Sequence, residues 1–138
     1  GLVSGLTRGS SLPQLARAAI ESIAYQVGDV FVAMQEASDG DLSVLMVDGG
    51  VTRNEQLMRF QADILGVPVQ RSNTAELSAM GAAYLAGLAV GMWSSTDEIA
   101  ALPRSVDRFE PTSDEAERAR LVAGWQDAVA RTTLHPDL

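Results

Sequence analysis

The chain has 138 residues, of which 46% are apolar, and its 10 basic against 18 acidic residues give it a formal net charge of −8. This size and apolar content fit one folded domain and exclude a disordered tail. Because the net charge is negative and the basic residues are scattered singly, we expect neither nucleic acid nor an anionic membrane surface as a partner.

The sequence contains no cysteine and a single histidine, which narrows the chemistry that it can carry. It offers no thiolate for a disulfide or a metal site and no core histidine for a Ser/His/Asp set, so we expect no metal ligands and no nucleophilic triad. His135 stands beside Pro136, where we expect a solvated side chain. No apolar run approaches the ~20 residues of a membrane span. The lack of cysteine and of a signal-peptide pattern favours the cytoplasm.

The first third of the chain predicts a strand and a long helix. Gly1 to Gly5 reads as a short strand that is entered in the middle of a fold, so we expect this chain to be a piece of a longer protein. Apolar residues then recur at helical spacing from Leu12 to Met34, which predicts an amphipathic helix. Ser11 is its expected N-cap, and Pro13 lies in the first turn, where a missing N–H costs nothing.

The middle of the chain alternates strands and helices. Leu42 to Val47 is an evenly apolar run, typical of a strand buried on both faces, and Asp48 to Gly50 ends it in a turn. Helical spacing resumes from Asn54 to Leu65, and Gly66 is the expected stop. Val67 to Gln70 then predicts a short strand, whose proline favours an edge position or the start of the strand.

The next predicted helix, capped by Thr74 and reaching about Val90, is unusual for its small residues. Four of them recur every four positions and would leave a shallow strip for the close packing of another element: Ala79, Ala83, Gly87 and Gly91. Gly81 costs this helix about 1 kcal/mol relative to alanine, so we expect a packing or ligand reason for it.

Residues 95–138 are predicted to be a helical segment of the same domain. Ser95 to Glu98 has capping-box spacing for a short helix, Leu102 to Phe109 reads as a connector, and Thr112 to Glu115 opens a final helix. The order of elements argues for an α/β fold with a short, mostly parallel sheet flanked by helices. Three strands would leave at least one sheet edge uncovered.

The glycine turn after the second predicted strand is the best candidate for a binding site. Ligands of open α/β sheets bind at the carboxyl ends of strands, and Gly49 and Gly50 would let a flat or anionic group lie against the backbone near a helix start. A plain tight turn explains the same residues, and both interpretations stay open. Neither a Walker pattern nor a GxGxxG fingerprint is present. Asp48 and Glu21 would serve acid–base chemistry as a pair only if the fold brought them together.

Gly1 to Leu6 and, after seven more residues, Gln14 to Glu21 form the longest pattern in the chain. This pattern resembles the second signature of the FGGY carbohydrate kinases, without a departure. Further stretches are similar to the glycerol kinases within that family: residues 5–9, 21–26, 60–69 and 81–91. The resemblance covers the chain to about Trp125.

The resemblance implies a fold and a nucleotide site. The fold is part of the second ribonuclease-H-like lobe of the actin-like, Hsp70-like ATPases, with ATP and Mg²⁺ bound in a cleft between two lobes. Residues 47–54 resemble the adenosine motif of that lobe, which implies nucleotide contacts for Gly50 and Asn54, with Gly49 beside them. Thr52 and Arg53 depart from the commonest glycerol-kinase wording at this place, where other members also vary.

The resemblance also implies what the chain lacks. The catalytic aspartate of the family, its polyol-binding residues and its phosphate loop would lie upstream of Gly1, so we expect no catalytic residue here and no turnover by this chain alone. For the whole protein we expect transfer of the γ-phosphoryl group of ATP to glycerol, giving glycerol 3-phosphate. Another sugar or polyol of the xylulose, ribulose or gluconate type stays open as the substrate, as do a non-catalytic interaction module and assembly as a homo-oligomer.

Overall fold

The computed structural model describes residues 1–38, 41–74 and 76–133, so the solvated side chain expected for His135 lies outside the described residues. No helix in these ranges combines the length and the hydropathy that crossing a bilayer requires. The elements in chain order are α1 (Leu12–Ala37), β1 (Leu45–Val47), the 3₁₀ helix η1 (Gly50–Arg53), α2 (Glu55–Leu65), β2 (Val69–Ser72), α3 (Leu77–Ala89), α4 (Thr96–Ala100), β3 (Val106–Phe109) and α5 (Glu115–Thr133).

The three strands form one sheet in the order β1-β2-β3. β1 and β2 run parallel, with Leu45 opposite Val69, whereas β2 and β3 run antiparallel, with Val69 opposite Phe109. The α/β class is thus confirmed, but the sheet is mixed rather than mostly parallel. The difference arises because β3 falls in the segment expected to be a connector, where only four residues form the strand.

The strand expected at Gly1 to Gly5 is wrong. These residues are exposed and have no regular secondary structure. A strand needs a neighbour to satisfy its N–H and C=O groups, and within the described part of the chain no strand pairs with this segment.

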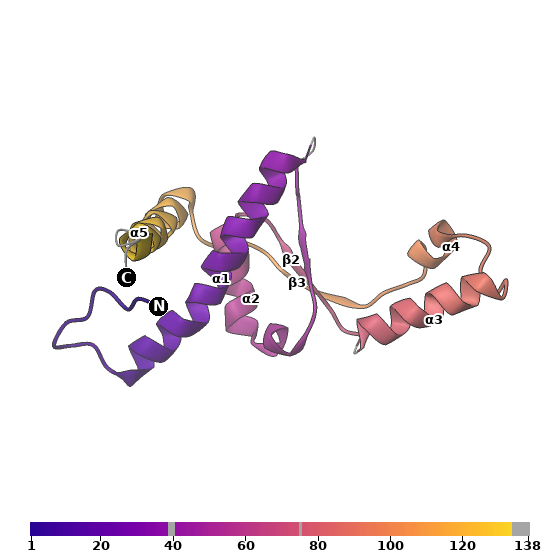
Figure 1. Ribbon diagram of the computed structural model, residues 1–138, viewed down its shortest axis with the longest axis horizontal. Coiled ribbons are helices and arrows are strands. Elements are labelled where there is room, and N and C mark those ends of the chain that lie inside the picture. Colours follow the sequence, from indigo (N-terminus) through magenta and orange to yellow (C-terminus); the bar gives the residue numbers. More distant parts are fainter. Residues whose placement is uncertain (39–40, 75, 134–138) are drawn as a thin grey trace.

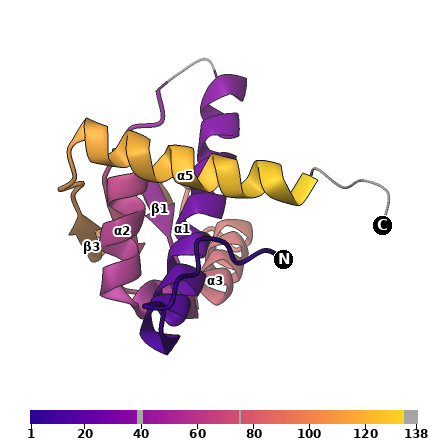
Figure 2. The same ribbon diagram turned by 90° about the vertical axis from the view of Figure 1, so that its left-hand side faces the viewer.

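The core lies between the sheet and α2, and α1 packs beside α2 (Figure 2). Successive side chains of a strand alternate between its two faces, so one face of the sheet turns Leu45, Val69 and Phe109 toward α2. The buried residues of this cluster are Ala24, Leu57, Met58, Ala62, Val69 and Phe109. Between the two helices, the buried Gln61 amide donates a hydrogen bond of 3.1 Å to the Ala24 carbonyl.

Local signals fix the ends of α2 and the position of α5. Gly66 ends α2 with a left-handed φ of 70°, as predicted for a helix stop. α5 begins where the Asp114 carboxylate accepts from the Glu117 N–H at 2.8 Å, so Asp114 is its N-cap. The Thr112 N–H instead donates to the Asp63 carboxylate at 2.5 Å, which ties the start of α5 to α2.

The opposite face of the sheet is not covered by the described residues. Met46 of β1 and Val106 of β3 point to this face and are 68% and 39% exposed. Much of α1 is solvent-exposed as well, since Ala24 and Phe31 are its only buried residues. Apolar surface of this kind is typical of a domain that packs against further protein.

α3 and α4 form an arm that projects from the end of the β2–β3 pair, away from α1, α2 and α5 (Figure 1). The expected cap is wrong, because α3 begins at Leu77 after Glu76, and the Thr74 N–H donates to the Ser72 hydroxyl at 3.1 Å. The small-residue strip is covered by the described chain only at Gly87, where the Trp93 ring packs. A β-carbon there would lie 2.2 Å from Trp93 Cζ3.

Candidate functional site

A groove of about 520 Å³ lies where β1 and β2 end. The two strands are parallel, so their carboxyl ends share one edge of the sheet, the place where open α/β sheets bind ligands. The groove is lined by the turn after β1, by η1, by the residues that follow β2 and by the start of α3: Asp48, Gly49, Gly50, Thr52, Arg53, Glu55, Arg71, Ser72, Asn73, Thr74, Glu76, Leu77 and Ser78.

Backbone conformation requires a glycine at one of the two positions of the turn but not at the other. Gly49 has a φ of 98° and a ψ of 171°, a backbone conformation that side chains with a β-carbon avoid. Gly50 has no such conformation, and a β-carbon on it would meet no atom of the described chain within 4 Å. The turn geometry therefore accounts for Gly49 and leaves Gly50 as open backbone on the wall of the groove.

Thr52 stabilises the turn by hydrogen bonds to the Gly49 carbonyl. This residue is 5% exposed, its hydroxyl donates to the Gly49 carbonyl at 2.7 Å, and its N–H reaches the same oxygen at 3.2 Å. Its own carbonyl accepts a hydrogen bond of 2.8 Å from Arg71 Nη1. The conformation of the turn is thus linked through Thr52 to β2.

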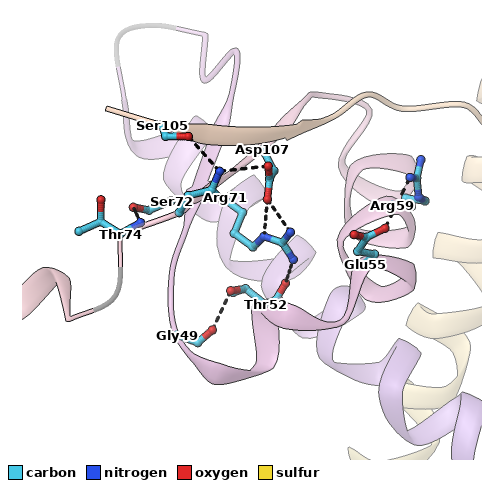
Figure 3. Close-up of polar contacts among 10 residues, drawn as sticks. Gly49, Thr52, Glu55, Arg59, Arg71, Ser72, Thr74, Ser105 and Asp107 are labelled. Atoms are coloured by element: carbon cyan, nitrogen blue, oxygen red, sulfur yellow. Dashed lines mark hydrogen bonds and ion pairs between the residues drawn. The ribbon is translucent and has the colours of Figure 1, made fainter. Parts of the chain in front are cut away.

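Arg71 connects the groove to β3, as Figure 3 shows. Its Nη2 and Nε donate to one oxygen of Asp107 at 2.6 and 3.2 Å, and the guanidinium lies 5.3 Å from the centre of the Phe109 ring. The other oxygen of Asp107 accepts from Asn73 Nδ2 at 3.1 Å. The hydrogen bonds from Arg71 first, and from Asn73 second, hold the pKa of the Asp107 carboxyl below its ordinary value.

Charges of both signs line the groove. Asp48, Glu55 and Glu76 bring carboxylates and Arg53 an exposed guanidinium, whereas the guanidinium of Arg71 is engaged by Asp107. Within the residues that the structure describes, no three carboxylate, imidazole or thiol groups gather as a metal site would require.

Asn54 lies at the start of α2 rather than in the groove wall. Its side-chain oxygen accepts from the Leu57 N–H at 3.1 Å and so caps the helix. The residue lines a second hollow, between α1 and α2, together with Glu21. The fold brings Gly49 and Gly50 together in the groove and places Asn54 at the far end of η1. Asp48 and Glu21 line different hollows, so the carboxylate pair is not formed.

The hydrogen-bonded group of Arg71, Asn73 and Asp107 was not predicted from the sequence. Asp107 lies in the segment taken as a connector, so nothing suggested a carboxylate opposite Arg71. Val106 and Phe109 are residue types that favour strands, and prolines at 103 and 111 bound the segment. Those features were the available signal for β3 and for the ion pair that it carries.

Comparison with known proteins gives consistent matches over most of the chain. Residues 1–90 match the model of the C-terminal domain of the FGGY family of carbohydrate kinases. The glycerol kinase of Carboxydothermus hydrogenoformans is 55% identical over 131 residues, and that of Pseudomonas savastanoi pv. phaseolicola is 54% identical over 132 residues. These alignments cover 95% and 96% of this chain but only 26% of each relative, so the chain spans about a quarter of their length.

Solved structures agree on the fold. The crystal structure of Plasmodium falciparum glycerol kinase with ADP superimposes with a TM-score of 0.83 at 33% identity, covering 95% of this chain and 26% of that one. The xylulose kinase of Rhodospirillum rubrum gives a TM-score of 0.73 at 29% identity, over 96% of this chain and 27% of that one. The fold of this chain is therefore shared with carbohydrate kinases.

Proposed function

The chain belongs to the FGGY family of carbohydrate kinases, and from that premise we propose that it forms the nucleotide-facing part of an ATP-dependent glycerol kinase. In the whole protein the γ-phosphoryl group of ATP moves to a terminal hydroxyl of glycerol. A phosphorus–oxygen bond to glycerol forms as the bond to the β-phosphate bridge breaks, which gives glycerol 3-phosphate and ADP. Residues 1–138 act as one domain fragment, with residues 95–138 as its helical end.

One observation carries the nucleotide assignment: Gly50 presents open backbone to a groove at the carboxyl edge of the sheet. A flat or anionic group can lie against such backbone more closely than against any side chain. The ADP held by the Plasmodium falciparum enzyme, with which this chain shares its fold, supports a nucleotide as the ligand.

In this proposal Gly50 and Gly49 contact the nucleotide in the groove, and the amide N–H₂ group of Asn54, at the other end of η1, contacts a part of the nucleotide that extends beyond the groove. The side-chain oxygen of Asn54 is occupied by the helix cap, so the amide nitrogen is the group left to donate to a ribose or phosphate oxygen. Mg²⁺ enters as part of the Mg-ATP substrate, held by the phosphates and by residues of other parts of the protein.

Transfer itself requires more than this chain provides. Positioning and charge stabilisation dominate phosphoryl transfer, so both walls of the cleft must contribute. We place the base that takes the proton of the glycerol hydroxyl, and the glycerol site, in the three quarters of the relatives' length that this chain does not match. The isolated chain would then bind nucleotide without turning over glycerol.

Glycerol is preferred over other substrates because relatives named glycerol kinase are 52–55% identical to this chain. The Rhodospirillum rubrum xylulose kinase shares the fold at 29% identity, so a pentulose is the second candidate. A panel of glycerol, xylulose, ribulose and gluconate, tested with the whole protein, separates these substrates. A cytoplasmic location and the formation of a homo-oligomer stay predictions.

The test of the proposal is glycerol-dependent ADP release with Mg-ATP, comparing the whole protein with the 138-residue chain. We expect turnover by the whole protein only. Gly50→Val in the whole protein should raise KM for ATP about tenfold or more and leave KM for glycerol within about twofold, since the new side chain fills the place of the nucleotide.

Gly124→Val is the matched control for this substitution. A β-carbon at Gly124 also meets no atom within 4 Å, but the residue lies on α5 and does not line the groove. It should leave both KM values unchanged. Equal rises of the two KM values in Gly50→Val, or turnover of glycerol by the 138-residue chain, would refute the assignment.

A further inference from the structure

Arg71 links strand β3 to the residue that hydrogen-bonds the glycine turn. It lies on β2, on the face that turns toward α2, between Val47 of β1 and Asp107 of β3. Its side chain is 16% exposed, so the guanidinium is largely withdrawn from solvent. A buried guanidinium needs partners for its donors, and each partner that it finds is held in a fixed place.

The partners of Arg71 come from two segments that are far apart in the sequence. Two donors reach Asp107 Oδ2, at 2.6 and 3.2 Å, and a third reaches the carbonyl oxygen of Thr52 at 2.8 Å. The contact with Asp107 fixes the plane of the guanidinium, and that plane determines where Nη1 points. Asp107 is itself oriented by Asn73, which donates to its second oxygen at 3.1 Å.

The carbonyl that Arg71 contacts belongs to the residue that shapes the turn. Thr52 donates to the Gly49 carbonyl from its hydroxyl and from its N–H, at 2.7 and 3.2 Å. Figure 3 shows the resulting path from Asp107 through Arg71 and Thr52 to Gly49. Gly49 has a φ of 98°, and its carbonyl accepts both of these hydrogen bonds, so they hold the peptide that joins Gly49 to Gly50.

We infer that Arg71 is a positioning residue for nucleotide binding: held by Asp107, it fixes η1 and thereby keeps the Gly49–Gly50 backbone in the orientation that accepts the nucleotide. This inference rests on the proposed nucleotide site. It adds to that site a residue whose charge is paired with Asp107 within the protein. Arg71 acts through Thr52 and does not contact the nucleotide itself. Replacing Arg71 therefore leaves the Gly49–Gly50 backbone present but no longer held in one orientation.

The test measures the Kd for ADP by calorimetry on the whole protein, together with KM for glycerol. Arg71→Met should weaken ADP about tenfold, because the turn loses its charge-assisted hydrogen bond. Arg71→Lys keeps the charge but cannot reach Asp107 and Thr52 at once, so it should also weaken ADP, though less. Asp107→Asn should have an intermediate effect, and KM for glycerol should stay within about twofold in all three.

Arg108→Met is the matched control. Arg108 is the neighbour of Asp107 on β3, points to the opposite face of the sheet and pairs with Glu110 at the surface. It should change neither ADP affinity nor KM for glycerol. If the Met variant fails to fold, Arg71→Lys and Asp107→Asn decide the question, since both keep side chains of similar size and hydrogen-bonding groups.

The outcomes separate this inference from the proposed function. If Gly50→Val weakens ADP and the folded Arg71 and Asp107 variants do not, the positioning role is refuted while the nucleotide site stands. If the variants alter ADP affinity and KM for glycerol equally, Arg71 is a general structural residue and the inference fails. If Gly50→Val leaves the Kd for ADP unchanged, the nucleotide site itself is refuted, and the inference with it.

Discussion

The ring of Trp125 lies parallel to the ring of Tyr25, with an interplanar angle of 8° and centroids 5.3 Å apart. The indole N–H also donates to the Asp29 carboxylate at 2.8 Å. One residue of α5 thus joins two successive turns of α1. This contact attaches the middle of α5 to α1, whereas the start of α5 is tied to α2 through Asp63.

Trp125→Ala should therefore loosen α5 locally. Loss of the ring stacking and of the hydrogen bond should speed amide exchange across Glu115–Thr133 about tenfold, and exchange in α3 should not change. Trp125→Phe keeps the stacking and should show a smaller rise. Hydrogen exchange of the whole protein, followed by mass spectrometry, makes the measurement. Uniform acceleration in α3 and α5 would show that the ring supports the entire domain instead.

Two glycines of α3 should respond to alanine in opposite directions. Gly87→Ala puts a β-carbon against the Trp93 ring and should destabilise the protein by about 1–3 kcal/mol, because the ring must move. Gly81 faces open space, so Gly81→Ala should stabilise the helix by about 0.5–1 kcal/mol. The thermal unfolding midpoints of the two variants, each compared with that of the wild type, measure these changes in stability. A loss in Gly81→Ala as large as that in Gly87→Ala would mean that another segment of the protein packs there.

Gly49→Ala and Gly50→Ala should separate backbone strain from ligand approach. The φ of 98° makes alanine at Gly49 cost about 1–3 kcal/mol of stability, with or without nucleotide. Alanine at Gly50 should leave the unfolding midpoint of the nucleotide-free protein unchanged. It should make the increase in that midpoint on addition of ADP smaller than in the wild type. Unfolding scans with and without ADP measure both quantities, and a stability loss in free Gly50→Ala contradicts the assignment of open backbone.

Asn54→Asp should preserve the start of α2 while weakening nucleotide binding. A carboxylate accepts from the Leu57 N–H as the amide oxygen does, so the cap is kept, but the N–H₂ donor is lost. Asn54→Ala should lose the cap as well, at about 1 kcal/mol. Unfolding midpoints report the cap, and the Kd for ADP reports the donor. Unaltered ADP affinity in Asn54→Asp would remove Asn54 from the nucleotide site.

The ion pair of Arg71 and Asp107 should make stability fall in acid. Because the pKa of the Asp107 carboxyl is lowered in the folded protein, its contribution is fully present above the unfolded pKa and is lost as the pH falls through the folded pKa. The stability difference between the wild type and Asp107→Asn should thus be largest near neutral pH and shrink below about pH 4. Unfolding midpoints over that range test it; a constant difference would show that the carboxylate charge is not involved.

The sequence predicts best those parts of the fold that local signals determine. The spacing of apolar residues predicted α1 and α2, and Gly66 was predicted as the stop that its left-handed backbone provides. The strand expected at Gly1 to Gly5 failed because strands depend on partners, which a local pattern cannot supply. β3 was missed because its local signal, two strand-favouring residues between prolines, is short, and its pairing with β2 completes the strand.

The candidate site was predicted in part for the same reason. Gly49 and Gly50 signal a turn by their residue type, whereas the place of Asp107 beside Arg71 follows from strand register alone. The cap formed by Asn54 was also missed, although asparagine before a helix is a common N-cap. The sequence thus predicted the backbone that lines the groove and not the side chains that hold it.

The two stems of the α3–α4 arm leave the sheet side by side, where the Asn73 N–H donates to the Ser105 carbonyl at 3.0 Å and the Asn73 amide reaches the Ser105 hydroxyl at 3.1 Å (Figure 1). These hydrogen bonds join the two stems at the base of the arm. Its near end carries Leu77 and Ser78, which line the groove. The two residues move with the arm, so any displacement of the arm relative to the sheet would change the lining of the groove.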